Sequence, residues 1–265
     1  MDALTSVIKA LARREGVSLL GIVSARGWKA ARGRRPKDIL PDAESVVVMA
    51  MQIADKAIDE ASPKERQGIR RAIDKELVRA GAEITEVLAE NGFNGVTAVS
   101  PIYKTGYLDI VNGEVEFNGL NAVPPTYRTP EPPVTSKSLS SDWEYLQGSI
   151  PLKYAAQMAG LGVVGKNSLL ITPQYGPRVR LAAIITNAQL TPDKPLNKDL
   201  CGKCTVCEKV CIAKAISEGH LDIKMCWRAE MELGEPVPGT PYKLCPAPCL
   251  KFCPAGKLKE KWQIA

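Results

Sequence analysis

Long hydrophobic runs are missing from this sequence of 265 residues. No apolar stretch approaches the ~20 residues that a membrane-spanning helix needs, so the sequence offers no transmembrane segment. A strong excess of charge of either sign is missing too, because the formal net charge is only +6. A mildly basic balance suits an acidic protein partner, and we expect neither a membrane nor a nucleic acid as partner.

Cysteine is missing from the first 200 residues, and all eight cysteines lie between positions 201 and 253. The first four follow the spacing C-x2-C-x2-C-x3-C. In bacterial ferredoxins this spacing wraps a [4Fe–4S] cluster, because a tight loop can offer a ligand to the irons at every third residue. Eight thiolates are the number that two such clusters need. The eight residues are Cys201, Cys204, Cys207, Cys211, Cys226, Cys245, Cys249 and Cys253, with Pro254 after the last.

Crossed ligation is the arrangement that we predict for the two clusters, because the fourth cysteine of a ferredoxin run binds the other cluster of the domain. Two features depart from the ferredoxin pattern. Ile212 stands where a proline usually follows the run, and the second half reads C-x3-C-x3-C. One cluster is expected to take Cys201, Cys204, Cys207 and Cys253, and the other Cys211, Cys226, Cys245 and Cys249.

Zinc ions and disulfide bonds are the alternatives for these cysteines. Structural zinc sites favour two C-x2-C pairs about 15–20 residues apart, whereas here a third cysteine follows at the same short spacing. Disulfide frameworks are typical of small secreted chains that have little hydrophobic core. The spacing therefore favours iron–sulfur clusters over both alternatives.

The N-terminal region has a superficial likeness to an export signal, because Arg13-Arg14 precedes a modestly apolar stretch. The apolar residues before the pair have helical spacing, however. Residues 2–15 therefore predict an amphipathic helix and 18–24 a core strand, both retained in a cytoplasmic protein. The basic residues over 26–37 predict a solvated loop, with a docking patch for an acidic electron donor as the alternative. They are Arg26, Lys29, Arg32, Arg34, Arg35 and Lys37.

Helix and strand patterns are mixed along the first 195 residues. We expect an α+β protein, with a mixed α/β domain over 1–195 and a ferredoxin-like cysteine-rich domain over 196–265. Between 100 and 148 the periodicity weakens, and this region holds an Asn-Gly hairpin signal and a proline-rich run. The predicted strands are 45–50, 95–99 and two within 168–187, and the predicted helices are 63–90 and 150–159.

Glycines gather just before the cysteines, at positions 160, 162, 165 and 176. Glycine lets the backbone approach a ligand or another segment closely. The G-x-G-x-x-G pattern at 160–165 formally matches the dinucleotide fingerprint. It follows a predicted helix and precedes a predicted strand, which reverses the order that the fingerprint requires. A dinucleotide site is therefore not predicted.

Six short segments and one cysteine carry a family resemblance. They are S-I-P-L at 149–152, A-G-L-G at 159–162, G-K-N at 165–167, L-L-I-T-P at 169–173, Y-G-P-R-V-R at 175–180, P-D-K-P at 192–195, and Cys226 with the W-R-A-E that follows it. With these segments the region 149–253 resembles the corrinoid-dependent iron–sulfur reductases, the family of the reductive dehalogenases and epoxyqueuosine reductase. The resemblance is diffuse over 1–148.

The resemblance implies a nitroreductase-like domain that holds cobalamin in its base-off form, with the nearer [4Fe–4S] cluster passing electrons to cobalt. His220 is the only histidine, which agrees with base-off binding that uses no histidine ligand. Arg178 would be a polar catalytic group near the cavity. By the same resemblance, the residues bordering the corrinoid would be Gly160, Gly162, Gly165, Lys166, Asn167 and Tyr175.

The proton donor is the part of the site in which this sequence departs from the family. Epoxyqueuosine reductases place an aspartate roughly where Leu146 or Gln147 falls here, so that acid is missing. The helical-repeat tail of those enzymes, an obvious tRNA-binding module, is not expected either. An ordinary surface or packing role is the alternative for each remaining acid. The candidate donors are Tyr145 and Glu144, followed by Asp142 and Tyr127.

Two functions follow from these patterns. The first is an iron–sulfur oxidoreductase that passes single electrons through two clusters to a base-off corrinoid, which reduces a small molecule. The second is an electron-transfer protein that reduces a partner protein and binds no corrinoid. Either would draw electrons from a low-potential donor such as a ferredoxin or flavodoxin, and would pass them to a small-molecule substrate or a corrinoid protein.

Overall fold

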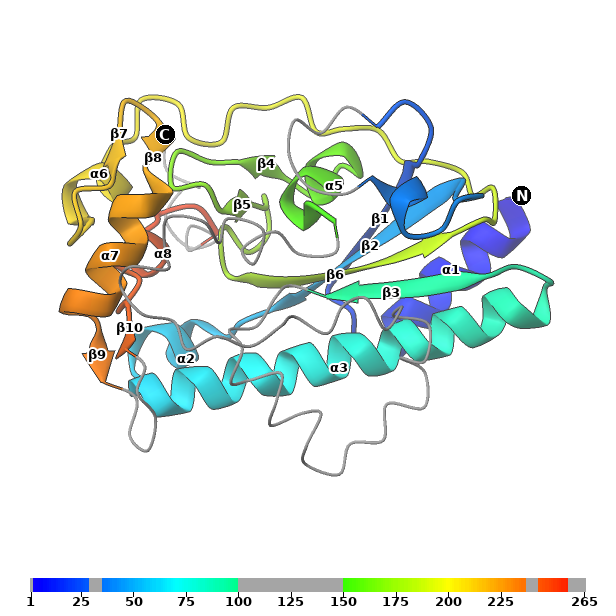
Figure 1. Cartoon of the computed structure of the whole chain (residues 1–265), viewed down its shortest axis with the longest axis horizontal. Coiled ribbons are helices and arrows are strands. Elements are labelled where there is room, and N and C mark those ends of the chain that lie inside the picture. The colour runs from blue at the N-terminus through cyan, green and yellow to red at the C-terminus, as the bar shows by residue number, and fades with distance from the viewer. Residues whose placement is uncertain (1, 29–34, 100–149, 237–242, 257–265) are drawn as a thin grey trace, which may run out of the picture.

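A four-stranded sheet forms the centre of the molecule (Figure 1). The computed structural model describes residues 2–28, 35–99, 150–236 and 243–256. The strands have the order β1-β2-β6-β3, and each neighbouring pair is antiparallel. This is the mixed α/β architecture expected from the sequence. The strands are β1 (Leu19–Ser24), β2 (Ser45–Gln52), β6 (Val179–Thr186) and β3 (Gly95–Val99).

Strand β2 lies inside the sheet and contributes to two apolar cores, because successive side chains of a strand point to opposite faces. Val46 and Val48 pack in the core that contains Ala155 of α5 (Leu152–Met158). Val47 and Met49 pack in the core shared with α1 (Asp2–Arg14) and α3 (Pro63–Glu90). Figure 1 shows α5 on one side of the sheet and α3 along the other. The sheet is thus covered on both faces.

Helix α3 has the boundaries that its sequence predicts. Ser62 and Glu65 form a capping box, in which the Ser62 amide donates to Glu65 at 2.8 Å and the Glu65 amide donates to Ser62 Oγ at 3.3 Å. Pro63 occupies the first turn, where its missing N–H costs nothing. At the other end Gly92 adopts a positive φ of 81° and turns the chain toward β3.

The segment that carries the eight cysteines is built from short elements, and we call residues 201–256 the cysteine module. It lies beside α2 (Asp55–Asp59) and the start of α3 (Figure 1). Its elements are α6 (Val206–Val210), β7 (Ile216–Ser217), β8 (His220–Leu221), α7 (Ile223–Leu233), β9 (Glu235–Pro236), β10 (Lys243–Leu244) and α8 (Pro248–Lys251). Before it come β4 (Val163–Val164) and β5 (Leu170–Ile171), which form a separate two-stranded sheet.

Most of the predicted elements are confirmed within the described residues, including the N-terminal helix and strand and the long helix. The predicted hairpin near 112 and the proline-rich run lie outside the described residues. So does half of the basic cluster, namely Lys29, Arg32 and Arg34. Of its described members, Arg26 forms an ion pair with Glu44 at 2.5 Å. Lys37 lies in a short 3-10 helix, Pro36–Asp38. Among the described helices, none is long and apolar enough to cross a membrane.

Two glycines offer a matched test of the packing. A Cβ at Gly21 in β1 would collide with the carbonyl oxygen of Ala159, whereas a Cβ at Gly68 in α3 would meet nothing within 4 Å. We expect Gly21→Ala to destabilise the protein by about 1–3 kcal/mol through overpacking. Gly68→Ala should stabilise it by about 0.5–1 kcal/mol, because alanine is the better helix former. Urea unfolding followed by circular dichroism measures both, and equal stabilities would contradict the packing of β1 against α5.

Candidate functional site

The first cysteine loop is shaped by backbone hydrogen bonds. The Cys204 amide donates to the Cys201 carbonyl at 2.9 Å, which closes a tight turn. The Asp199 carboxylate accepts from the amides of Cys201 and Gly202, each at 2.9 Å. These bonds, that from Gly202 first, lower the pKa of Asp199. Asp199 was not singled out from the sequence, although an aspartate two residues before a tight loop is a typical turn signal.

Cys253 lies near the first three cysteines although it is distant in the sequence. Burial raises the pKa of the Cys207 thiol, and the nearby charges of Cys201, Cys204 and Cys253 raise it further. Burial also raises the pKa of Cys253, and its thiol neighbours are again Cys201 and Cys204. We call these four residues the first quartet. The sequence also predicts these four as the ligands of one cluster, and this crossed ligation stays a prediction.

The other four cysteines, which we call the second quartet, are also electrostatic neighbours. Burial, followed by the charge of Cys245, raises the pKa of Cys226 to about 11 and that of Cys249 to about 12. Cys211 acts on both of them as well, and Cys207 of the first quartet acts on Cys249. Two amides point at sulfur in this group, that of Ala215 to Cys211 Sγ at 3.4 Å and that of Ala247 to Cys245 Sγ at 3.3 Å.

The eight thiols are the candidate metal ligands of this site. All eight cysteines are free and half-buried. Among the described His, Cys, Asp and Glu side chains, no three converge closely enough to hold one metal ion. The ligands of a cubane cluster bind four different irons, so they stand farther apart than the ligands of one ion. Buried thiols with raised pKa values stay protonated unless a cation compensates the thiolates, and bound iron would supply that charge.

The glycines predicted to border a corrinoid pack against protein. A Cβ at Gly160 would meet the backbone carbonyl of Lys194, and one at Gly162 would meet that of Ile171. A Cβ at Gly165 would lie 2.6 Å from the Ile171 side chain and 3.2 Å from Cys201 Sγ. Glycine is needed at these positions for close packing within the chain, so the three residues give no support to a corrinoid cradle.

Lys166 and Asn167 contact the cysteine module. The Lys166 amine donates to the carbonyls of Gly202 at 3.0 Å and Cys204 at 2.9 Å, inside the first cysteine loop. The Asn167 amide group donates to the Cys249 carbonyl at 3.0 Å. These two predicted cofactor-binding residues therefore reach toward the quartets.

Tyr175 lies in the turn between β5 and β6. Its amide donates to Thr172 Oγ1 at 3.0 Å. A Cβ at Gly176 would collide with the carbonyl of Ala255, and one at Gly256 would collide with the backbone of Tyr175. Both glycines have positive φ, 55° and 82°. The turn therefore packs backbone to backbone against the end of the cysteine module.

Arg178 is buried, with 1% of its surface exposed. Its guanidinium donates to the carbonyls of Lys251, Cys253 and Ala255 at 3.2, 3.0 and 2.9 Å. Its Nε also forms an ion pair with Asp55 at 2.9 Å. The guanidinium of Arg178, which the sequence predicts to be catalytic, is thus already bound by three carbonyls and one carboxylate. The geometry is that of a positioning residue, which holds the chain between Cys249 and Cys253.

The predicted proton donors cannot be placed in this site. Tyr145 and Glu144 lie outside the described residues, as do the further candidates Asp142 and Tyr127. Among the predicted site residues that the structure describes, Lys166, Asn167 and Arg178 direct polar side chains at the module.

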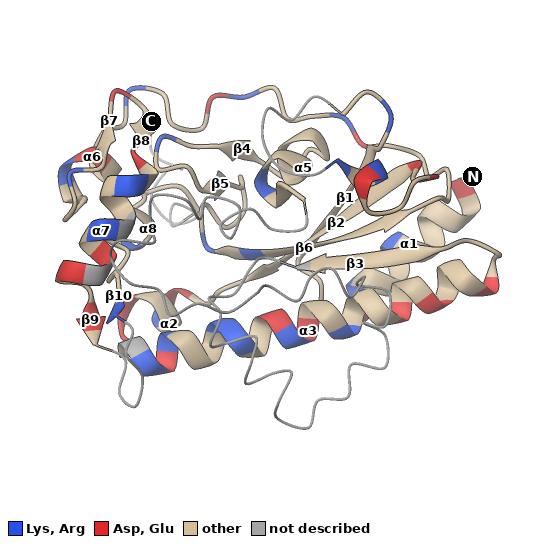
Figure 2. Cartoon of the chain, viewed as in Figure 1, with Lys and Arg blue, Asp and Glu red and all other residues tan. Residues whose placement is uncertain are grey.

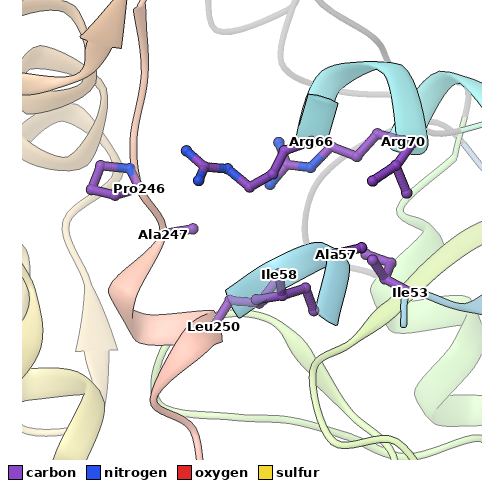
Figure 3. Close-up of a pocket in the computed structure, with 9 residues that line it drawn as sticks. Ile53, Ala57, Ile58, Arg66, Arg70, Pro246, Ala247 and Leu250 are labelled. Atoms are coloured by element: carbon purple, nitrogen blue, oxygen red, sulfur yellow. The ribbon is translucent and has the colours of Figure 1, made fainter. Parts of the chain in front are cut away.

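A small pocket lies where α2 and α3 meet the cysteine module (Figure 3). Its apolar side is formed by Ile58 and Leu250, and Arg66 and Arg70 extend over it from α3. Arg66 is held by Glu235 at 2.7 Å. No residue predicted from the sequence as part of the site lines this pocket, so it is a junction between the module and the helices.

Known proteins resemble the chain in sequence, although no family model matches it. The epoxyqueuosine reductase of Listeria monocytogenes is 47% identical over 72 residues, and that of Bacillus subtilis is 28% identical over 194. The tetrachloroethene reductive dehalogenase of Dehalobacter restrictus is 40% identical over 90 residues. The chain is a homologue of both kinds of reductase.

Each match covers only part of the two proteins compared. The three alignments span 27%, 72% and 33% of this reductase homologue, and 19%, 40% and 16% of the respective relatives. The chain thus spans well under two thirds of the length of the curated relatives that it matches.

Solved structures of both kinds of reductase share the fold. An epoxyqueuosine reductase with a modified tRNA stem loop aligns with a TM-score of 0.64 at 19% identity, over 96% of this homologue and 66% of that chain. A reductive dehalogenase described as acting by B12-dependent dehalogenation aligns with a TM-score of 0.59 at 20% identity, over 94% and 31%. At this identity the alignments establish the fold alone.

Proposed function

We propose that the chain is an iron–sulfur oxidoreductase in which each quartet holds one [4Fe–4S] cluster. The observation that carries the proposal is the grouping of the thiols, since Cys253 is a neighbour of Cys201 and Cys204, and Cys211 is a neighbour of Cys226. A cubane bound in this way carries one electron at a time. The relatives named as reductases support the same class of reaction.

The residues of this chain would hold and shield the clusters. Asp199 fixes the backbone of the first loop, and the amides of Ala215 and Ala247 donate to thiol sulfurs of the second quartet. Hydrogen bonds to sulfur and limited solvent exposure are two of the factors that set the potential of a cluster. Arg178 would keep Cys253 within reach of the first loop.

We further propose that electrons pass to a base-off corrinoid that reduces a small molecule. The support comes from the relatives, one of which is described as acting by B12-dependent dehalogenation. Gly160, Gly162 and Gly165 give it no support, because the space beside each is filled by protein.

The second candidate is an electron-transfer protein that reduces a partner protein and binds no corrinoid. The observation that favours it is the close packing of Gly160 and Gly162 against the chain itself. Under this alternative the cysteine module has the same role, and the acceptor is a protein.

For the electron donor we propose an acidic, low-potential carrier such as a ferredoxin or flavodoxin. The half of α3 nearer the cysteine module carries more basic than acidic residues, whereas the far half carries more acidic than basic ones (Figure 2). Long-range attraction of this kind speeds the encounter of oppositely charged proteins.

A nucleic acid is a further candidate partner, contrary to the expectation from net charge, because one relative of this fold is described with a tRNA stem loop.

We also propose a domain boundary near residue 195, between the mixed α/β domain and the cysteine-rich domain. Several contacts tie the residues before it to the cysteine module, such as the hydrogen bond of Lys251 to the Asp59 carbonyl at 2.8 Å. The ion pair of Arg66 with Glu235 at 2.7 Å is another. We expect the module to need the first domain for its folded geometry.

One experiment tests the cofactors. The protein is purified and reconstituted without oxygen, and its iron and acid-labile sulfide are measured. Two clusters predict about eight of each per chain, and about four would contradict the assignment. Cobalamin is then added, and the visible spectrum of the eluted protein is recorded after gel filtration. Co-eluting base-off corrinoid supports the reductase, whereas no binding at micromolar cobalamin leaves the electron carrier. A tRNA stem loop in place of cobalamin tests the nucleic-acid partner.

A further inference from the structure

The turn that precedes β5 sends two neighbouring side chains to the two different quartets. Lys166 reaches the loop of the first quartet, where its amine donates to the carbonyls of Gly202 and Cys204 at 3.0 and 2.9 Å. Asn167 reaches the second quartet, where its amide group donates to the Cys249 carbonyl at 3.0 Å. One side chain carries a positive charge and the other is neutral.

The turn itself is held firmly. The Gly165 amide donates to the Leu169 carbonyl at 2.9 Å, and the Ser168 amide donates to the Gly165 carbonyl at 2.8 Å. Asn167 is 4% exposed, and its side-chain oxygen Oδ1 accepts from the Leu169 amide at 3.2 Å. The Lys166 side chain is half-buried. Its ammonium group is thus fixed by two hydrogen bonds instead of moving freely in water.

The charges around the two quartets differ. Besides Lys166, the buried guanidinium of Arg178 lies at the first quartet, where it donates to the Cys253 carbonyl at 3.0 Å. At the second quartet the carboxylate of Glu230 accepts from the Cys245 amide at 3.1 Å. Glu230 raises the pKa of Cys245, while Arg70 lowers it and burial remains the largest cause of its shift. The first quartet thus has two fixed cations, Lys166 and Arg178, together with the carboxylate of Asp199, whereas the second has Glu230 and Arg70.

We propose that Lys166 is a positioning residue that also raises the reduction potential of the first cluster. The inference rests on the proposed function. A reduced cluster carries one more negative charge than an oxidised one, so a nearby fixed cation stabilises the reduced state.

Potentiometric titration of the reconstituted full chain, followed by electron paramagnetic resonance, tests this inference. Lys166→Met should move one of the two cluster transitions to lower potential and leave the other in place. The transition that moves should be the one that disappears in Cys253→Ala. Lys166→Arg keeps the charge and should restore the potential.

Lys153 gives a matched control, because its amine also donates to a backbone carbonyl, that of Ser168 at 2.7 Å, but not to the module. Lys153→Met should leave both transitions unchanged. If Lys166→Met shifts neither transition, or shifts both equally, the inference is wrong. If that variant does not retain its iron, Lys166→Gln and Lys166→Arg are compared, and equal potentials in the two would overturn it. Failure of the proposed function is distinct, since the unmodified chain would then lack two clusters.

Discussion

Alanine at Cys253 should remove the same cluster as alanine at Cys204, although the two residues are far apart in the sequence. Each single variant is expected to fall from about eight to about four irons per chain, because a cubane that loses one ligand is assembled poorly. The physical reason is that Cys253 has Cys201 and Cys204 as its thiol neighbours. Alanine is preferred to serine because it offers no oxygen ligand.

Double variants make this result decisive. Cys204→Ala with Cys253→Ala should retain the same iron as either single variant, since both act on one cluster. Cys211→Ala with Cys253→Ala should lose nearly all iron, since the two act on different clusters. Iron analysis and the number of transitions in a redox titration measure this. The opposite pattern would mean that the run of four cysteines binds a single cluster and that ligation is not crossed.

Methionine at Arg178 should destabilise the protein by about 3 kcal/mol or more, because a buried carbonyl left without a donor costs about 1–3 kcal/mol. Arg178 serves several such carbonyls from a position that is 1% exposed. The ion pair with Asp55 contributes less, since the Asp55 side chain is 52% exposed. Arg178→Lys should recover only part of the loss, because an ammonium lacks the planar fork of a guanidinium.

Arg26 is the matched control for this experiment, since it forms an ion pair at the surface with Glu44. Arg26→Met should leave the free energy of unfolding nearly unchanged, because an exposed ion pair is screened by solvent. Urea unfolding of the anaerobic protein measures both variants, and their iron content is measured in parallel. An Arg178→Met chain as stable as Arg26→Met would show that Arg178 does not hold the cysteine module.

Local sequence signals predicted the regular elements well. Ser62, Pro63 and Glu65 form a capping box that marks the start of α3, and Asn91-Gly92 marks its end. Helix α5 and strand β6 likewise fall within the predicted ranges. Such signals are reliable here because each depends on residues within one turn of one another.

The contacts of the candidate site were beyond what spacing can predict. The glycine run before the cysteines suggested a ligand surface, but Gly160 and Gly162 face the backbone of Lys194 and Ile171. Likewise Lys166 and Arg178 donate to carbonyls of the cysteine module, and a carbonyl has no side-chain identity that a sequence pattern could reveal. Long-range contacts of this kind depend on how the segments pack after each has formed.

The backbone contact of Gly176 with Ala255 has a consequence for the order of assembly. The turn before β6 forms part of the surface on which the end of the cysteine module lies, and Arg178 in the same region holds the carbonyl of Cys253. We therefore expect Cys253 to be held at the first loop only once this turn and Arg178 are in place. Under the proposed crossed ligation, the last iron–thiolate bond would form late in folding. Cluster loading would then report that the N-terminal sheet is complete.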